Sequence, residues 1–229
     1  MKITVRGAAA LLVTTAALVA GCSSPPGPAP ASPAPALPAD AIAYDALKST
    51  DRPFPFTNSC KQITAPVLAA VSGRKATDIK SLAGPAGCMV AISGNPELEQ
   101  VWLEPKSPPN PSEPRYFPLL WDGKGASTYH RRLIFAGRYY AVETIDFYGG
   151  QPGCFLTVDT GSPTALQFRG ILPEKFANTY PELNPGNTGY EIDHEGTQKF
   201  MDENCPVVEK IAGDLIEAVD PRGGSLATA

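Results

Sequence analysis

The chain has 229 residues, a formal net charge of −4, 43% hydrophobic and 18% charged residues, and 25 prolines. This composition excludes a disordered acidic chain, which would carry fewer apolar and more charged residues. It also lacks the basic excess of a nucleic-acid binder. A multi-span membrane protein would need several apolar runs of about 20 residues. We therefore expect one globular domain with further segments in front of it.

Residues 1–21 have the pattern of a lipoprotein signal peptide. Lys2 and Arg6 precede an apolar run, Gly7–Ala20, that is too short to cross a bilayer. The run closes in Leu-Val-Ala-Gly-Cys, which resembles the bacterial lipobox, where cleavage precedes the cysteine. The resemblance implies that Cys22 becomes the mature N-terminus and carries a diacylglycerol. We therefore expect a lipid-anchored protein on the extracytoplasmic face of the cell membrane, with an ordinary secretory signal as the alternative.

Residues 22–40 are expected to comprise the lipidated cysteine and a disordered linker. From Ser23 to Ala39 the chain consists of Ser, Pro, Ala, Gly and one Leu, and such a segment buries too little apolar surface to fold. Dense proline favours an extended stalk of about 3.1 Å per residue. We place the globular domain at residues 41–220 and a disordered tail at residues 221–229.

Four cysteines remain in the exported domain, and an even number in an oxidising compartment predicts two disulfides. Of the three possible pairings we favour Cys60–Cys88 with Cys154–Cys205, because each closes a moderate loop and ties a helix start to a strand start. A zinc site is the alternative. It is disfavoured because no pair shows C-x₂₋₄-C spacing and both histidines lie far from any cysteine in sequence.

Local patterns predict the elements of the first half of the domain. Thr64 as N-cap, Pro66 in the first turn and Gly73 at the end predict a helix of about two turns, with Val67, Leu68 and Val71 on one side. The other expected elements are a short helix over Ala41–Lys48, an extended segment over Arg52–Phe56, strands over Cys88–Ser93 and Gln100–Glu104, and a proline-rich loop or edge over Pro105–Pro118.

The second half reads as two hairpins and a helix. Strands over 133–135 and 139–147 flank a turn at 136–138, and strands over 154–158 and 165–172 flank a turn at Asp159–Ser162. An apolar stripe then predicts an amphipathic helix from about Asn204 to Asp220, within which Gly213 suggests close packing on the sheet. The stripe consists of Val208, Ile211, Leu215 and Val219.

Consecutive strands with helices at both ends predict an α+β fold. We expect a mainly antiparallel sheet, a short N-terminal-side helix, a C-terminal amphipathic helix and two disulfides.

Several segments together resemble one protein family. These are Ser59-Cys60 at the opening of a short helix, Gly84-x-x-Gly87-Cys88 leading a strand, Gly153-Cys154-Phe155, and Cys205-x₅-Ala212-x₂-Leu215 in the last helix. The pattern resembles the actinobacterial lipoprotein domain known as domain-of-unknown-function family 3558, over roughly Asp51 to Val219. Ser59 and Met89 depart from the usual proline and aromatic residue of its members. The resemblance implies a lipid-anchored envelope protein and assigns no catalytic residues.

Asp159-Thr160-Gly161-Ser162 matches the motif of pepsin-like aspartic proteases. That chemistry needs two carboxylates that share a proton, and the chain contains no second Asp-Thr/Ser-Gly. Asp and Gly are also the residues that a turn between two strands favours. We therefore expect a turn, although a protease built from two chains remains open.

Asp193-His194-Glu195 brings three candidate metal ligands together in sequence. Consecutive residues of a strand point to opposite faces and do not converge by themselves. Because the surrounding stretch, Asn184–Gly196, is rich in Gly, Asn and Pro, we expect a solvated loop. The chain also lacks a nucleophile elbow and phosphate-binding glycine loops, so we expect no cofactor, no metal and no catalytic residue.

Aromatic side chains are the last candidates. Most are expected in the core, but Tyr116, Phe117 and Trp121 follow the proline-rich stretch and are candidates for a ligand or partner surface. Two functions of different class result. The favoured one is a noncatalytic module that binds an apolar small ligand or another envelope protein. The alternative is an exported hydrolase that uses Asp159 or a metal at Asp193–Glu195.

Overall fold

The computed structural model describes residues 43–44, 51–57, 60–84, 87–93, 95, 97–98, 100–108, 110, 112, 115–123, 130–148, 151–173, 175 and 194–226. The chain divides into two units between Ala39 and Asp40, and every described residue belongs to the second unit. The predicted signal peptide, Cys22 and the linker therefore lie outside the described residues. The helix expected over Ala41–Lys48 also lies outside them, apart from Ala43 and Tyr44.

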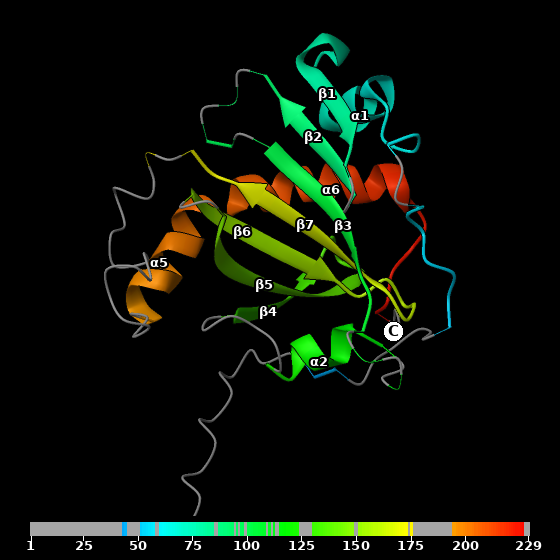
Figure 1. Ribbon diagram of the computed structural model, residues 1–229, viewed down its shortest axis with the longest axis vertical. Coiled ribbons are helices and arrows are strands. Elements are labelled where there is room, and N and C mark those ends of the chain that lie inside the picture. Colours follow the sequence, from blue (N-terminus) through cyan, green and yellow to red (C-terminus); the bar gives the residue numbers. More distant parts are fainter. Residues whose placement is uncertain are drawn as a thin grey trace, which may run out of the picture. The chain divides into compact units, whose positions relative to one another are not determined.

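Seven strands form one antiparallel sheet in the order β1-β2-β3-β7-β6-β5-β4 (Figure 1). Strands β1 to β3 form one meander and β4 to β7 a second, and the two are joined where β3 pairs with β7, from Gln100↔Ile171 to Lys106↔Ala165. The strands are β1 (Ile79–Ala83), β2 (Cys88–Ile92), β3 (Gln100–Lys106), β4 (His130–Phe135), β5 (Tyr139–Tyr148), β6 (Gln151–Val158) and β7 (Ala165–Ile171).

The described residues also contain four α-helices and one turn of 3₁₀ helix. These are α1 (Ala65–Ser72), η1 (Ala76–Asp78), α2 (Phe117–Trp121), α5 (His194–Asn204) and α6 (Pro206–Val219). The fold is α+β, with a mainly antiparallel sheet, a short helix before it and an amphipathic helix at its end, as the sequence predicts. No helix among the described residues is long and apolar enough to span a membrane.

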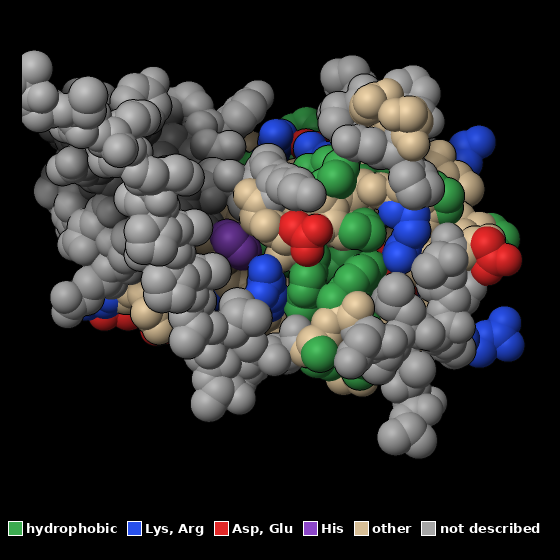
Figure 2. Space-filling view, turned by 90° about the horizontal axis from the view of Figure 1, so that it is seen from below, with side chains coloured by type: hydrophobic (Ala, Val, Ile, Leu, Met, Phe, Trp, Pro, Cys, Tyr) green, Lys and Arg blue, Asp and Glu red, His purple; other side chains and the backbone are tan. Residues whose placement is uncertain are grey.

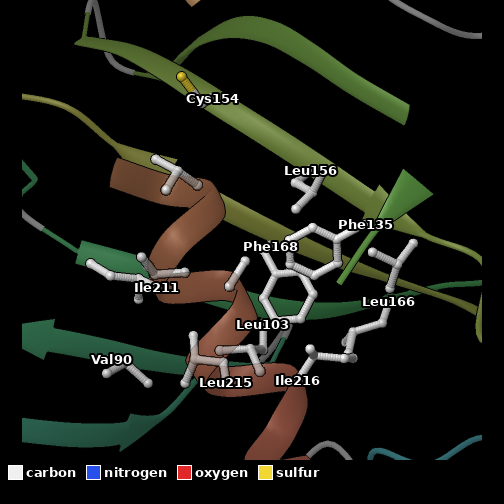
Figure 3. Packing of buried hydrophobic residues seen from close by; sticks show 14 of the residues in the cluster. Val90, Leu103, Phe135, Cys154, Leu156, Leu166, Phe168, Ile211, Leu215 and Ile216 are labelled. Carbon is white, nitrogen blue, oxygen red and sulfur yellow. The ribbon is translucent and has the colours of Figure 1, made fainter. Parts of the chain in front are cut away.

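Helix α6 packs its predicted apolar stripe onto one face of the sheet. Val208, Ile211, Leu215 and Val219 are all buried. Opposite them lie side chains from three neighbouring strands, Leu103, Leu156 and Phe168 (Figure 3). The stripe of the helix and the alternation of the strands thus form one continuous core.

The second face of the sheet carries a smaller core under α2. On β5, Tyr139 and Ala141 belong to the α6 core, whereas Tyr140 and Val142 belong to the cluster that contains Phe117, Leu120 and Trp121 of α2. Successive residues of a strand point to opposite faces. Helices α6 and α2 therefore pack on opposite sides of the sheet.

The closest approach of helix to sheet is at a different glycine from the one predicted. A Cβ on Gly213 would meet only Phe135 Cζ, at 4.0 Å, so the expectation of close packing at Gly213 is wrong. A Cβ on Gly170 of β7 would instead overlap both methyl groups of Val208. Helix α6 can therefore approach β7 closely because Gly170 has no side chain where Val208 of the helix packs.

Helix α1 forms as the sequence predicts but buries less of its surface. Thr64 is the N-cap residue, without a side-chain capping bond, and Gly73 ends the helix in the left-handed conformation at φ 68°. Of the three apolar residues expected on one side, only Leu68 is buried, because Val67 and Val71 remain 39% and 38% exposed.

Four described elements have no counterpart in the sequence prediction, namely β1, η1, α2 and α5. Helix α2 lies where a proline-rich loop was expected to end, and it accommodates Pro118 in its first turn, where no backbone N–H is needed. Strand β3 continues through Pro105, which pairs with Leu166 of β7. The pairing of β2 with β3 ends at Leu103, so β3 is locally an edge at this proline.

Both predicted disulfides are present. Cys60, which precedes α1, is bonded to Cys88 at the start of β2, with 5.3 Å between their Cα atoms. Cys154 of β6 is bonded to Cys205, the residue before α6, with 5.6 Å between their Cα atoms.

The C-terminal segment expected to be disordered from residue 221 packs on the body as far as Leu226. The backbone N–H groups of Ser225 and Leu226 donate to the carbonyl of Arg138, and the Ser225 hydroxyl accepts from the Tyr140 N–H at 3.0 Å. Ser225 is fully buried. The tail prediction is therefore wrong for residues 221–226, because hydrogen bonds to the β4–β5 turn hold them.

Candidate functional site

The Asp159–Ser162 motif is the turn between β6 and β7, and it is buried. The side chain of Asp159 is 1% exposed. It accepts hydrogen bonds from Arg115 Nη2 at 2.5 Å, from Tyr44 Oη at 2.5 Å and from the Gly161 N–H at 2.8 Å. A carboxylate with three donors is fully engaged inside the turn.

The other side chains of the motif are used within the turn as well. The hydroxyls of Thr160 and Ser162 lie 2.9 Å apart, and each lies 2.7 Å from the carbonyl oxygen of Thr164. Both residues are buried. Both hydroxyls are therefore engaged in hydrogen bonds within the turn.

A second Asp–Arg pair flanks the same turn. Arg52 forms a bidentate ion pair with Asp220, and its Nη1 also donates to the Thr160 carbonyl at 3.1 Å. Tyr139 Oη donates to Asp220 Oδ2 at 2.8 Å. Each aspartate thus has its own arginine and its own tyrosine, and the segments around Tyr44, Arg52 and Asp220 are all tied to one turn.

The Asp159 motif and the aromatic residues of α2, two separate candidates in the sequence, both contact Tyr44. Its hydroxyl binds Asp159, and its ring lies against three aromatic rings, with centroid distances of 5.6 Å to Phe117, 5.2 Å to Trp121 and 4.9 Å to Tyr140. We call the five residues around Tyr44 the cage. They are Phe117, Trp121, Tyr140, Arg115 and Asp159.

Of the three aromatic residues proposed as a ligand or partner surface, two are buried and one is partly exposed. Phe117 and Trp121 are 1% and 4% exposed, so they are core residues and not part of a surface. Tyr116, at the N-cap of α2, is half-buried. Figure 2 views the body from the side of α2 and shows hydrophobic side chains gathered there beside Lys and Arg side chains. Arg132 lies over the Trp121 ring at 5.3 Å and donates two hydrogen bonds to its carbonyl.

The electrostatics of the cage differ from those of an aspartic protease site. Proton-sharing carboxylates of an aspartic protease must face one another, whereas Asp159 faces Arg115 and Asp220 faces Arg52. Burial, together with the adjacent Asp159 carboxylate, raises the pKa of the Tyr44 phenol well above its usual range. Tyr44 therefore stays neutral and donates its proton to Asp159.

The cluster Asp193-His194-Glu195 is not the loop that the sequence suggested. Helix α5 begins at His194, so His194 and Glu195 lie in its first turn, and Asp193 lies outside the described residues. The loop prediction is wrong at residues 194–196, which all lie in α5. No group of three His, Cys, Asp or Glu side chains suited to a metal ion occurs in the described part of the chain.

An acidic cluster that the sequence did not reveal lies between β4, β5, α5 and α6, and Glu143 is its buried member. Arg131 binds Glu143 at 2.6 Å and both Asp202 and Glu209 at 2.7 Å. Glu143 is fully buried, and this burial raises its pKa to about 8, with a further increase from Glu209 that the positive charge of Arg131 opposes. Glu143 is therefore largely protonated at neutral pH.

A further charged row lies on the sheet face opposite α6. Glu104 is 4% exposed and pairs with Lys106 at 2.9 Å and Arg169 at 3.0 Å. Arg169 also lies over the rings of Trp102 and Phe155, at 5.6 and 5.9 Å. The Glu104–Arg169 ion pair joins neighbouring strands, so the row contributes to the pairing of β3 with β7.

The roles of Tyr44 and Arg115 are not evident from the sequence, because these residues lie 115 and 44 positions from Asp159. The one available signal was an aromatic residue directly after a proline-rich linker, where a segment without a docking role would be polar. No family model matches the chain, and no curated protein or solved structure matches it either.

Proposed function

We propose that the chain is a lipid-anchored protein of the bacterial cell envelope, and that its globular domain is a noncatalytic binding module. Its ligand would be an apolar small molecule or another envelope protein. The stalk before the domain would hold it away from the extracytoplasmic face of the membrane.

The observation that carries the noncatalytic part is the ion pair of Asp159 with Arg115. The carboxylate that the protease motif would use is 1% exposed and bound by three donors. A general acid or base must reach its substrate and exchange a proton with it. Asp159 instead organises an aromatic cage, and aromatic walls with a few directed polar groups are typical of ligand sites.

The anchoring part is supported by the lipobox-like sequence before Cys22 and by the cysteine pattern. The two disulfides agree with export to an oxidising compartment. The same cysteines carry the resemblance to family 3558, so membership in that family is part of the proposal.

Membrane fractionation in an actinobacterial host tests the anchor. We expect the unaltered chain to fractionate with membranes and its N-terminal peptide to carry a diacylglycerol mass. The Cys22→Ala variant should be released or remain unprocessed, whereas the neighbouring control Ser23→Ala should behave as the unaltered chain. A processed Cys22→Ala variant that stays acylated in the membrane fraction would contradict the proposal.

Native mass spectrometry of the mature chain, extracted gently from envelopes, tests for binding. Extra mass on the folded protein that is lost on denaturation would be a carried ligand, and a crosslinked envelope protein would be a partner. Incubation with a peptide library tests the hydrolase alternative. Cleavage that disappears in a folded Asp159→Asn variant would overturn the noncatalytic assignment.

A further inference from the structure

The walls of the cage around Tyr44 come from the body of the domain and also contact one another. Phe117 and Trp121 are four residues apart on α2 and therefore share one helix face. Trp121 contacts both other walls, at 5.8 Å to Phe117 and 5.4 Å to Tyr140. Tyr140 is held in β5, where its carbonyl accepts the Asp159 N–H.

The polar end of the cage specifies a hydroxyl group. Tyr44 Oη donates to Asp159 Oδ2 at 2.5 Å and accepts from Arg115 Nη1 at 3.1 Å. Arg115 and Asp159 also bind each other at 2.5 Å, and Arg115 Nε donates to the Ser162 carbonyl. The polar end therefore offers one donor, Arg115 Nη1, and one acceptor, Asp159 Oδ2. A phenol hydroxyl can bind both.

The group that fills the cage comes from the N-terminal end of the domain. Tyr44 lies four residues beyond Asp40, where the second unit of the chain begins. The same segment is fixed a second time at Arg52, whose N–H donates to the Gly161 carbonyl and whose guanidinium pairs with Asp220. Release of Tyr44 would therefore leave the segment attached to the body.

We propose that the cage is a binding site for a phenol-bearing ligand and that Tyr44 is its displaceable intramolecular occupant. The inference deepens and rests on the proposed binding function. The ligand chemistry is an aromatic ring with one hydroxyl. It would be supplied either by a small phenol or by a tyrosine side chain of a peptide.

Competition with Tyr44 sets the affinity that the chain would show. A group tethered by a short segment competes at an effective concentration in the millimolar range. The apparent affinity for an external phenol is the intrinsic affinity multiplied by the fraction of molecules in which Tyr44 has left the cage. Removal of the Tyr44 ring should therefore strengthen binding without any new contact.

Fluorine NMR titration of the mature chain with para-fluorophenol tests the inference, with fluorobenzene as the matched probe that lacks the hydroxyl. We expect saturable binding to the unaltered chain and at least about tenfold tighter binding to Tyr44→Ala. The Tyr44→Phe variant, which fills the walls but leaves the polar end free, should lie between them. Fluorobenzene should bind Tyr44→Ala at least about tenfold more weakly than the phenol, because it lacks the hydrogen bond to a charged group.

Displacement of the fluorinated probe distinguishes the two ligand sources. Displacement by para-cresol and N-acetyltyrosinamide alike supports a peptide tyrosine, and displacement by para-cresol alone supports a small phenol. Binding to Tyr44→Ala but not to the unaltered chain would overturn the inference, because Tyr44 would then be a permanent part of the core. Equal affinity for phenol and fluorobenzene would overturn it too. If these titrations fail while native mass spectrometry still finds a carried ligand, the binding module stands and the cage does not.

Discussion

Arg115 and Asp159 form an ion pair in the interior of the domain, with 2.5 Å between Nη2 and Oδ1 and side chains that are 10% and 1% exposed. A buried pair contributes little net stability when both partners are present, but loss of one partner leaves an uncompensated charge. We therefore expect the main role of the pair to be positioning: it holds the β6–β7 turn and the cage in one arrangement.

Removal of either partner of this pair should destabilise the fold strongly. We expect Arg115→Met and Asp159→Asn each to lower the free energy of unfolding by about 3 kcal/mol or more. The double variant should lose less than the sum of the two, because it leaves no unpaired charge. Denaturant titration measures these values, with Lys210→Met as control.

Lys210 pairs with Asp214 at 3.3 Å but is 68% exposed, so its loss should cost no more than about 0.5 kcal/mol. Equal effects of the interior and surface substitutions would show that Asp159 is solvated, contrary to the structure.

Two glycines that face the same helix–sheet interface should respond oppositely to alanine. Gly170→Ala places a methyl group onto Val208 and should destabilise the domain by about 1–3 kcal/mol, the usual cost of overpacking. Gly213→Ala meets only Phe135 at 4.0 Å and should stabilise helix α6 by roughly 0.5–1 kcal/mol. Thermal unfolding of the two variants compares them directly, and a shift in the same direction would contradict the packing described.

Local sequence patterns predicted the elements whose signals are local. The N-cap and the terminal glycine predicted α1, and the stripe from Val208 to Val219 predicted α6. Runs of β-forming residues on either side of turn residues predicted both hairpins. Strand β1 was missed because it buries fully only Ile79, and α5 because its polar sequence places only a few side chains, such as Phe200 and Met201, in the core. Elements that bury few side chains have only a weak hydrophobic periodicity in their sequence, and pattern reading does not detect them.

The candidate site could not be assembled in this way. Asp159 and the aromatic residues of α2 were each identified, but their connection runs through Tyr44, which is 115 positions from Asp159. A pairing between distant segments leaves no trace in the spacing of either one. The burial of the Asp159–Ser162 turn could not be predicted for the same reason. The residues that cover it, Arg115 and Tyr44, lie far from it in sequence, and its own composition indicates only a turn.

The two disulfides should differ in their susceptibility to reduction. Cys88, Cys154 and Cys205 are fully buried, whereas Cys60 is only half-buried. A thiol reductant needs access to a sulfur atom, so Cys60–Cys88 should open first. Alkylation and peptide mass spectrometry at increasing reductant concentration follow this order. Simultaneous loss of both bonds would mean that global unfolding precedes reduction.

The two disulfides should also differ in their contribution to stability. Cys154–Cys205 spans 51 residues and Cys60–Cys88 spans 28, and the chain-entropy model gives the longer loop about 0.5 kcal/mol more. We expect paired alanine substitutions to cost about 2–5 kcal/mol in each case. The Cys154/Cys205 variant should be the less stable, because both of its sulfur positions are fully buried. Denaturant titration of the two paired variants measures the difference.

The protonated state of Glu143 should make the fold less stable as the pH rises. Its carboxyl faces Arg131 of β4 and Glu209 of α6, and Arg131 also binds Asp202 of α5. In the unfolded chain Glu143 ionises near pH 4.3, whereas burial raises its pKa to about 8 in the folded state. Between these values the folded state holds the extra proton, so the free energy of unfolding falls as the pH rises.

Glu143→Gln mimics the protonated carboxyl and should remove this dependence. Relative to the unaltered chain, the variant should gain about 1 kcal/mol or more of stability between pH 5 and pH 9. Glu217→Gln is the matched control, because Glu217 also pairs with an arginine, Arg138, but is 47% exposed. Its stability difference from the unaltered chain should stay within about 0.5 kcal/mol over the same range. Parallel pH profiles for the unaltered chain and Glu143→Gln, measured by denaturant titration, would mean that Glu143 is ionised in the folded state and that Arg131 outweighs its burial.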